Sequence, residues 1–143
     1  MSSSAPIGQG LAEWLAWQET LHTSTIDLGL SRVAEVAARL QLLQPTFPII
    51  TVAGTNGKGS TVALLTAILQ AAGYQVGAYT SPHILRYNER ITLNSVQVAD
   101  ELLCQAFTAI ELARESTSLT YFEFGTLAAL WIFHQVQVDV AVL

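Results

Sequence analysis

A seven-residue glycine-rich segment, Gly-Thr-Asn-Gly-Lys-Gly-Ser at positions 54–60, constrains the fold more than any other part of the sequence. A β-rich run, Phe47 to Ala53, precedes it, and apolar residues repeat with helical spacing from Gly59 to Ala72. Residues 75–80 predict a second strand. A strand, a glycine loop, a helix and a strand within about 30 residues form a βαβ unit, which requires a parallel sheet. We therefore expect an α/β fold.

The rest of the chain supplies further elements for the same fold. Apolar spacing predicts a helix over Leu11 to Leu21 whose tryptophans pack in the core, and Ser31 is expected to cap a second helix. The run Phe47 to Ala53 and the last residues, Val138 to Leu143, predict parallel strands buried on both faces. The other expected elements are a small hairpin around Asn94-Ser95, a helix from about Asp100 to Arg114, and a mostly buried helix from Thr120 to Gln135. We expect no domain boundary inside the chain and, because nothing caps the last strand, a truncated chain.

The composition narrows the class of protein. Hydrophobic residues make up 51% of the chain and charged residues 12%, which excludes intrinsic disorder. The most apolar stretch, Phe124 to Phe133, is too short to span a membrane, and the N-terminus lacks the features of a secretory signal. The net charge of −5 argues against a nucleic-acid partner, and Cys104, the only cysteine, can form no internal disulfide. We expect a cytoplasmic protein that contacts neither nucleic acid nor membrane.

The chemistry of segment 54–60 favours a nucleotide phosphate site. Backbone amides between a strand and a helix can surround a phosphate, and glycines let it approach closely. Lys58, the only lysine, supplies positive charge, and Ser60 can offer a hydroxyl to magnesium. The segment departs from the common pattern, because the first glycine position falls on Val52 and Gly59 separates Lys58 from Ser60. A plain glycine turn with a solvated lysine is the alternative, and kinases, GTPases and ligases all stay open.

Several motifs resemble those of one enzyme family. They are Thr51 to Ser60, Tyr79-Thr80-Ser81-Pro82-His83, Glu89-Arg90-Ile91 and Phe122-Glu123-Phe124. These motifs closely resemble the ATP-binding half of folylpolyglutamate synthase and bacterial dihydrofolate synthase, members of the Mur ligase superfamily, and the similarity runs from about Asp27 to Leu143. The resemblance implies a P-loop-containing parallel sheet with flanking helices. It further implies that residues 1–143 are an ATP-binding domain, incomplete at its C-terminal end, without the C-terminal glutamate-ligase domain.

The resemblance also implies an ATP-dependent ligase of folate biosynthesis. The carboxylate of dihydropteroate or of a folate takes the γ-phosphoryl group of ATP, and the amino group of L-glutamate then attacks the acyl phosphate. Mg²⁺ neutralises charge on the phosphates, and Lys58 is the catalytic residue that stabilises the same charge. By resemblance, Mg²⁺ is held by Ser60 and Ser81, and ATP by Asn56, Gly57, Lys58, Gly59 and Ser60. We expect a monomer.

A second group of residues is expected, by the same resemblance, to bind the pterin part of the substrate. These residues are Asp27, Leu28, Gly29, Thr120, Tyr121, Phe122 and Glu123. Aromatic stacking, and a carboxylate facing the amino groups of the pterin, make chemical sense there. Thr120 and Glu123 are also spaced as a capping box, Asp-Leu-Gly could be a plain loop, and Ser81-Pro82 could simply open a turn. His83 is either a surface loop residue or a group near the phosphates or the substrate.

Two alternatives stay open. A cell-wall Mur ligase more often has threonine directly after the loop lysine, where this chain has Gly59, and it lacks the Asp-Leu-Gly and Ser-Pro-His combination. The other alternative is a noncatalytic nucleotide-binding fragment. The family continues from a strand like Val138 to Leu143 into a magnesium-binding glutamate and further ATP and glutamate contacts. We therefore expect this chain alone not to catalyse ligation.

Overall fold

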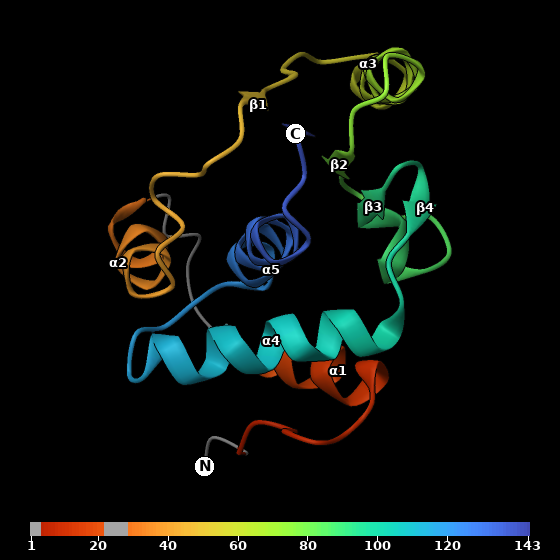
Figure 1. Cartoon of the computed structure of the whole chain (residues 1–143). Helices are drawn as coiled ribbons and strands as arrows, with labels where there is room; N and C mark the ends of the chain where they lie inside the picture. The colour runs from red at the N-terminus through yellow and green to blue at the C-terminus, as the bar shows by residue number, and fades with distance from the viewer. Residues whose placement is uncertain (1–3, 22–28) are drawn as a thin grey trace. The chain divides into compact units, whose positions relative to one another are not determined.

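Helices and a five-stranded sheet make up the chain, whose structure is a computed structural model that describes residues 4–21 and 29–143 (Figure 1). The predicted α/β fold class is confirmed. The chain divides into two compact units, Met1–Gln44 with Asp100–Ile132 and Pro45–Ala99 with Phe133–Leu143. No Gly-rich or Pro-rich linker marks these divisions in the sequence, and the assignment of the whole chain to one domain stays a prediction.

The first unit is built from helices. They are α1 (Leu11–Thr20), α2 (Ser31–Arg39), α4 (Asp100–Arg114) and most of α5 (Tyr121–Val136). Four aromatic rings form its centre, with neighbouring ring centroids between 5.6 and 6.2 Å apart. These rings belong to Trp14, Trp17, Phe107 and Phe124, all of them buried. The prediction that both tryptophans of the first helix lie in the core is confirmed.

The second unit is built around the sheet. Its strands are β1 (Ile49–Ile50), β2 (Val76–Tyr79), β3 (Ile91–Leu93), β4 (Val96–Gln97) and β5 (Val140–Val142), in the order β1-β5-β2-β3-β4. Strand β5 pairs in parallel with both β1 and β2, whereas β3 and β4 add an antiparallel hairpin after the short 3₁₀ helix η1 (Tyr87–Arg90). Helix α3 (Lys58–Ala71) connects β1 to β2. The predicted βαβ unit is therefore present, with β5 inserted between its two strands.

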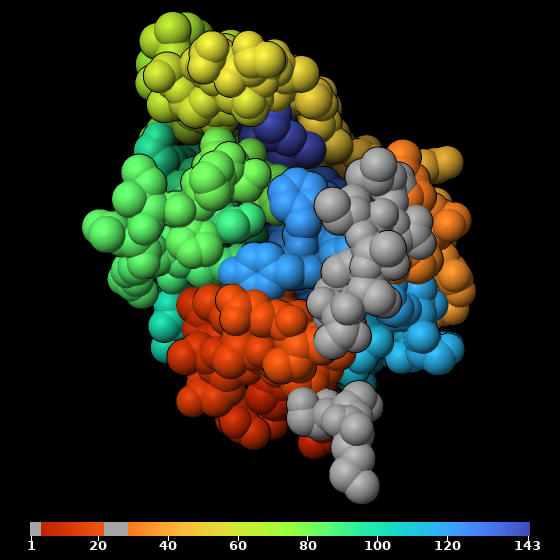
Figure 2. All heavy atoms as spheres, turned by 180° about the vertical axis from the view of Figure 1, so that it is seen from behind, coloured from red at the N-terminus to blue at the C-terminus, as the bar shows by residue number. Residues whose placement is uncertain are grey.

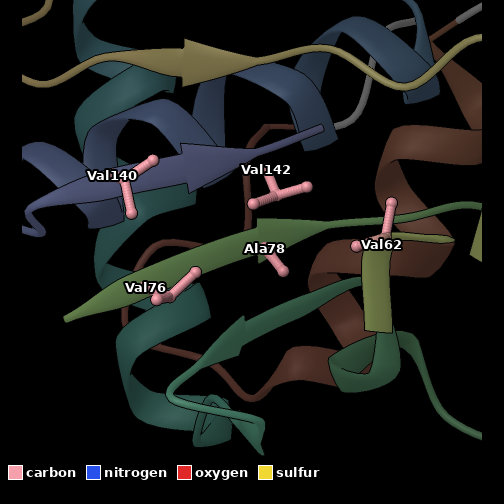
Figure 3. Packing of buried hydrophobic residues seen from close by; sticks show 5 residues of the cluster. All are labelled: Val62, Val76, Ala78, Val140 and Val142. Carbon is pink, nitrogen blue, oxygen red and sulfur yellow. The ribbon is translucent and has the colours of Figure 1, made fainter. Parts of the chain in front are cut away.

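Small and branched apolar side chains fill the space between α3 and the sheet. They are Val62, Val76, Ala78, Val140 and Val142 (Figure 3). Successive residues of a strand point to opposite faces of the sheet, so Gly77 lies on the other face of β2. On that face a Cβ on Gly77 would lie 2.4 Å from Phe133 Cδ1, so the Phe133 ring occupies the space that a side chain at position 77 would need.

Several predicted elements are confirmed. Helix α4 has the expected bounds, and β5 is a buried parallel strand. The β3–β4 turn contains no glycine, yet Asn94 and Ser95 both have positive φ, 49° and 65°, as a two-residue turn between twisted strands requires. No helix in residues 4–21 or 29–143 is both long and apolar enough to cross a lipid bilayer.

Three local expectations are wrong. Ser31 is the first helical residue of α2, Leu30 takes the capping position, and no side chain caps the helix. Strand β1 is only two residues long, and Ile49 and Ile50 are 37% and 36% exposed because β1 is the edge strand of the described sheet. Helix α3 begins at Lys58, one residue before the predicted start, so the last part of the glycine segment is helical.

The close packing of Gly77 on Phe133 gives a stability prediction. Gly77→Ala should lower the free energy of unfolding by about 1–3 kcal/mol, because a well-packed core accepts an added methyl group only with strain. Chemical denaturation measures this. Gly59→Ala is the control, because a Cβ there meets no atom within 4 Å. It should leave stability unchanged or raise it by up to about 1 kcal/mol through helix propensity, and equal losses in both variants would contradict the packing account.

Candidate functional site

The glycine segment runs from the end of β1 into the first turn of α3. Gly57 precedes the helix with φ 77° and ψ 8°, a left-handed conformation that glycine adopts without steric cost. Lys58, Gly59 and Ser60 form the first helical turn, and their amides have no acceptor inside the helix because it starts there. The N-terminal end of the 14-residue helix therefore presents free N–H donors and the positive end of its dipole.

This segment is open to the outside. Residues 53–61 are all exposed, and Figure 2 shows them in yellow at the surface of the molecule. A Cβ placed on Gly57 or Gly59 would meet no heavy atom within 4 Å. Thr61 fixes the turn, since its amide and its hydroxyl both donate to the Gly57 carbonyl, at 3.0 and 2.9 Å. An anion can thus approach the backbone without displacing a side chain.

Lys58 carries the positive charge of the segment. Its Nζ donates a hydrogen bond back to the carbonyl oxygen of Gly54, so the ammonium group lies over the segment that precedes the helix. Within the part of the chain that the structure describes, no carboxylate forms an ion pair with Lys58. The ammonium charge and the helix amides are therefore available to the same anion, an arrangement suited to phosphate.

The two serines predicted as magnesium ligands follow parallel strands that end at one edge of the sheet. Ser60 lies in the first turn of α3, and Ser81 follows β2 after Thr80. Strands β1 and β2 both run parallel to β5, and the direction of β2 and β5 is visible in Figure 3. Both hydroxyls are exposed oxygen donors. In residues 4–21 and 29–143 no cluster of three His, Cys, Asp or Glu side chains forms a metal site by itself.

These donors fit a magnesium ion that is bound together with phosphate. Mg²⁺ keeps several waters and takes only one or two protein ligands beside phosphate oxygens. An oxygen-only set of hydroxyls next to an anion site meets that requirement, whereas it would not suit a metal held by the protein alone. The residues present therefore fit a metal that arrives with its phosphate ligand.

The loop after β2 is fixed by contacts that the sequence did not predict, although His83 and Arg90 both belong to its quoted motifs. His83 Nδ1 accepts a hydrogen bond of 2.8 Å from Arg90 Nε, and the Arg90 guanidinium lies 5.3 Å from the centre of the Tyr87 ring. The His83 and Tyr87 rings are themselves 5.6 Å apart. His83 Nδ1 is therefore the acceptor in this contact, and Arg90 is part of the loop rather than a free surface charge.

Glu89 binds the backbone of the same loop. Its two carboxylate oxygens accept the amides of Ile84, Leu85 and Arg86 at 2.9, 2.8 and 2.7 Å. These hydrogen bonds, that from Ile84 foremost, hold the pKa of the Glu89 carboxyl below its ordinary value. A glutamate followed by Arg-Ile was visible in the sequence, but three amides converging on one carboxylate depend on a loop conformation that spacing does not predict.

The described residues among those predicted to bind a pterin belong to the helical unit. Asp27 and Leu28 lie outside the described residues, and Gly29 is exposed. The capping box is confirmed, because the Thr120 amide donates to Glu123 Oε2 at 2.8 Å and the Glu123 amide donates to Thr120 Oγ1 at 3.1 Å. Phe122 is 54% exposed beside it, so an aromatic ring lies partly at the surface at this helix start. Neither observation tests the predicted substrate role.

Comparison with known proteins gives high similarity to one group of enzymes. The dihydrofolate synthase/folylpolyglutamate synthase of Escherichia coli strain K12 is 54% identical over 133 residues, which are 93% of this chain and 32% of that protein. The structure of E. coli FolC in complex with DHPP and ADP matches with a TM-score of 0.93 and 51% identity, over 97% of this chain and 34% of that one. The Yersinia pestis bifunctional folylpolyglutamate synthase/dihydrofolate synthase complexed with AMPPNP and Mn ion matches with a TM-score of 0.93 and 49% identity, over 98% and 34%. No family model matches the chain.

These matches define the class first, a Mur-ligase-like α/β fold shared with enzymes that carry nucleotides in their solved structures. More particularly, the chain is similar over nearly its whole length to bacterial bifunctional dihydrofolate synthase/folylpolyglutamate synthase. The resemblance predicted from its motifs is confirmed. The chain spans about a third of the length of the relatives that it matches.

The lowered pKa of Glu89 gives a prediction for stability against pH. Because the folded-state pKa lies below the ordinary value of 4.5, the unfolded state binds protons first, and the contribution of Glu89 is lost as pH falls through the folded-state pKa. Glu89→Gln should therefore destabilise the protein at neutral pH. It should also flatten the fall in stability between about pH 5 and about pH 3.

Urea denaturation at a series of pH values measures both effects. The matched control is Glu19→Gln, which removes a carboxylate on the exposed side of α1. The control should retain the acid-dependent fall of the unsubstituted chain. A Glu89→Gln profile that parallels the control would show that the three amide contacts contribute nothing to stability.

Proposed function

We propose that this chain forms part of an ATP-dependent ligase that joins L-glutamate to dihydropteroate and to folates through an acyl phosphate. The observation that carries the proposal is the open glycine segment at the start of α3, with Lys58 hydrogen-bonded to the Gly54 carbonyl. This segment lies in a chain 54% identical over 133 residues to a dihydrofolate synthase/folylpolyglutamate synthase. The segment supplies anion binding, and the similarity supplies the substrate class.

The phosphates of ATP are proposed to lie against segment 56–60. Amides of the first turn of α3 donate to phosphate oxygens, and the glycines leave room for them. Asn56, Gly57 and Gly59 are assigned to this cradle together with Ser60. Lys58 exchanges its hydrogen bond with the Gly54 carbonyl for contacts to the transferring phosphoryl group, where it stabilises the charge that develops.

Ser60 and Ser81 are the proposed magnesium ligands of this chain. Their hydroxyls are exposed and belong to segments that follow two parallel strands. Bound Mg²⁺ would neutralise charge on the phosphate oxygens during transfer. Solved relatives support a nucleotide and a divalent metal together, since the Yersinia pestis enzyme is described with AMPPNP and Mn ion.

The proposed reaction balances in two steps. A carboxylate oxygen of the substrate attacks the γ-phosphorus, and ADP leaves with the electrons of the broken bond. The L-glutamate nitrogen then attacks the acyl carbon, phosphate leaves with the former carboxylate oxygen, and the nitrogen loses a proton. Lys58 acts in the first step by holding the oxygens of the transferring group in line, so that its contribution is positional and electrostatic.

The pterin end of the substrate is assigned to Asp27, Leu28, Gly29 and the start of α5. In the described part of this set, the exposed Phe122 ring offers a stacking face, and Glu123 offers a carboxylate to ring amino groups. Thr120 and Tyr121 complete the helix start. His83, held by Arg90, is proposed to lie near the bound phosphates or substrate.

The remaining parts of the proposal concern partners and location. The net charge of −5 supports the absence of a nucleic-acid partner. We also propose a cytoplasmic monomer that uses only small-molecule substrates. Residues 1–143 are proposed to be an ATP-binding domain of the Mur-ligase type.

Nucleotide binding and ADP formation test the proposal together. The chain should bind AMPPNP with Mg²⁺, and Lys58→Ala should weaken that affinity by about 2 kcal/mol, roughly thirtyfold, the size of a charge-assisted hydrogen bond. Arg39→Gln removes one positive charge from the helical unit and should leave the affinity within about twofold. Calorimetry measures both, and equal affinities in all three proteins would contradict the phosphate role.

ADP release by a protein of the relatives' full length that contains this chain then separates ligation from binding alone, since we expect the chain alone not to catalyse ligation. Release that depends on dihydropteroate and L-glutamate together supports a folate ligase. Dependence on UDP-linked peptides instead would favour a cell-wall ligase. AMPPNP binding without ADP release in any mixture would support nucleotide binding without catalysis as the activity of this chain.

A further inference from the structure

An arginine on α2 reaches the start of α5, although 91 residues separate the two in the sequence. Arg32 Nη1 donates to the backbone oxygen and the hydroxyl of Ser118, at 3.2 and 3.1 Å. Its Nη2 donates to Glu123 Oε1 at 3.4 Å, which makes an ion pair. All of these residues belong to the helical unit. One guanidinium thus holds both the turn before α5 and the carboxylate in its first turn.

The Glu123 carboxylate is fixed from two sides. Oε2 accepts the Thr120 amide at 2.8 Å, while Oε1 faces Arg32. The Glu123 side chain is only 12% exposed and that of Arg32 21%, so water competes weakly for either charge. A carboxylate oxygen has two lone pairs, and one on each oxygen is left after these contacts. Two adjacent N–H donors of a ligand match such a pair of acceptors.

A glutamate side chain that becomes ordered only when the ligand binds loses conformational entropy at that moment, and this loss lowers the affinity. Glutamate is among the side chains that lose most rotamer freedom on ordering. Because the contacts to Arg32 and Thr120 form on folding, the orientation exists before any ligand binds. Such preorganisation raises affinity without an added ligand contact.

We propose that Arg32 is a positioning residue for the pterin end of the substrate, acting through the Glu123 carboxylate rather than by touching the ligand. The inference rests on the proposed function, which assigns Glu123 to the amino groups of the pterin. Its physical content is separate: a neutral residue at position 32 leaves Glu123 with its capping contact but without its second anchor. The nucleotide segment belongs to the other unit, and the contacts of Arg32 to Ser118 and Glu123 lie within the helical unit, so ATP affinity should not follow the change.

Helix α2 provides a matched control two turns further on. Arg39 Nη1 donates to the carbonyls of Ala113 and Arg114 at 3.1 and 2.9 Å and to Thr117 Oγ1 at 3.3 Å. It therefore ties the same helix to the end of α4 with a comparable set of hydrogen bonds. None of these bonds involves Thr120 or Glu123. If variants of Arg32 and of Arg39 both lose affinity for dihydropteroate, the cause is lower stability of the helical unit. If only the Arg32 variant loses affinity, the cause is the positioning of Glu123.

The experiment compares the 143-residue chain with Arg32→Gln, Arg32→Lys and Arg39→Gln, using calorimetric Kd values for dihydropteroate and for AMPPNP with Mg²⁺. Arg32→Gln should raise the Kd for dihydropteroate about tenfold and change that for AMPPNP by less than about twofold. Arg32→Lys should recover part of the loss, because an ammonium keeps the charge on Glu123 but lacks the guanidinium fork. Arg39→Gln should leave both values near those of the unsubstituted chain.

Each other outcome has a defined meaning. If the unsubstituted chain binds dihydropteroate and Arg32→Gln binds it equally well, the inference is overturned while the proposed function stands. The inference is also overturned if Arg32→Gln weakens the affinity for both ligands equally, or if Arg32→Gln and Arg39→Gln have equal effects. In either case the role of Arg32 would be structural. Failure of the unsubstituted chain to bind dihydropteroate overturns the assignment of Glu123, and with it the inference.

Discussion

The parallel pairing of β5 with both β1 and β2 is the constraint on which the candidate site depends. Val142 lies opposite Ile50 on one side and Ala78 on the other, so three strands end at a common edge. The glycine segment follows β1, and Ser81 follows β2. Residues 140–142, distant from both in sequence, therefore determine where the segments that lead to Lys58 and Ser81 leave the sheet. The carboxyl ends of parallel strands are where α/β proteins bind their ligands.

Carboxylates shape the loops on which the proposed binding groups stand. Glu89 accepts three amides in the loop after β2, and Glu123 accepts one at the start of α5. In each case a carboxylate accepts hydrogen bonds from backbone amides that have no carbonyl acceptor in a regular helix or strand. The acidic balance of the chain is thus partly structural. At the glycine segment, the positive charge that an anionic ligand meets is that of Lys58, the single lysine of the chain.

Sequence patterns predicted the features that depend on residues close together in the chain. The glycine segment, the α3 repeat and the bounds of α4 followed from spacing, and the Thr120–Glu123 capping box from two residue types three positions apart. The exposed edge position of β1 could not be predicted, because strand order is decided by tertiary pairing with β5. The contacts of Arg32 could not be predicted for the same reason, because its partners Ser118 and Glu123 are 86 and 91 residues away in the sequence. Roles of individual site residues depend on a bound ligand and stay predictions.

Because the chain contains no other lysine, contact between Lys58 and the phosphates of ATP can be measured directly. Acylation with an amine-reactive ester marks only Lys58 and the α-amino group, and peptide mass spectrometry follows both rates in one sample. Mg-ATP should slow the modification of Lys58 and leave the α-amino rate unchanged, since only Lys58 lies against the phosphates. Equal rates for Lys58 with and without saturating Mg-ATP would contradict the account.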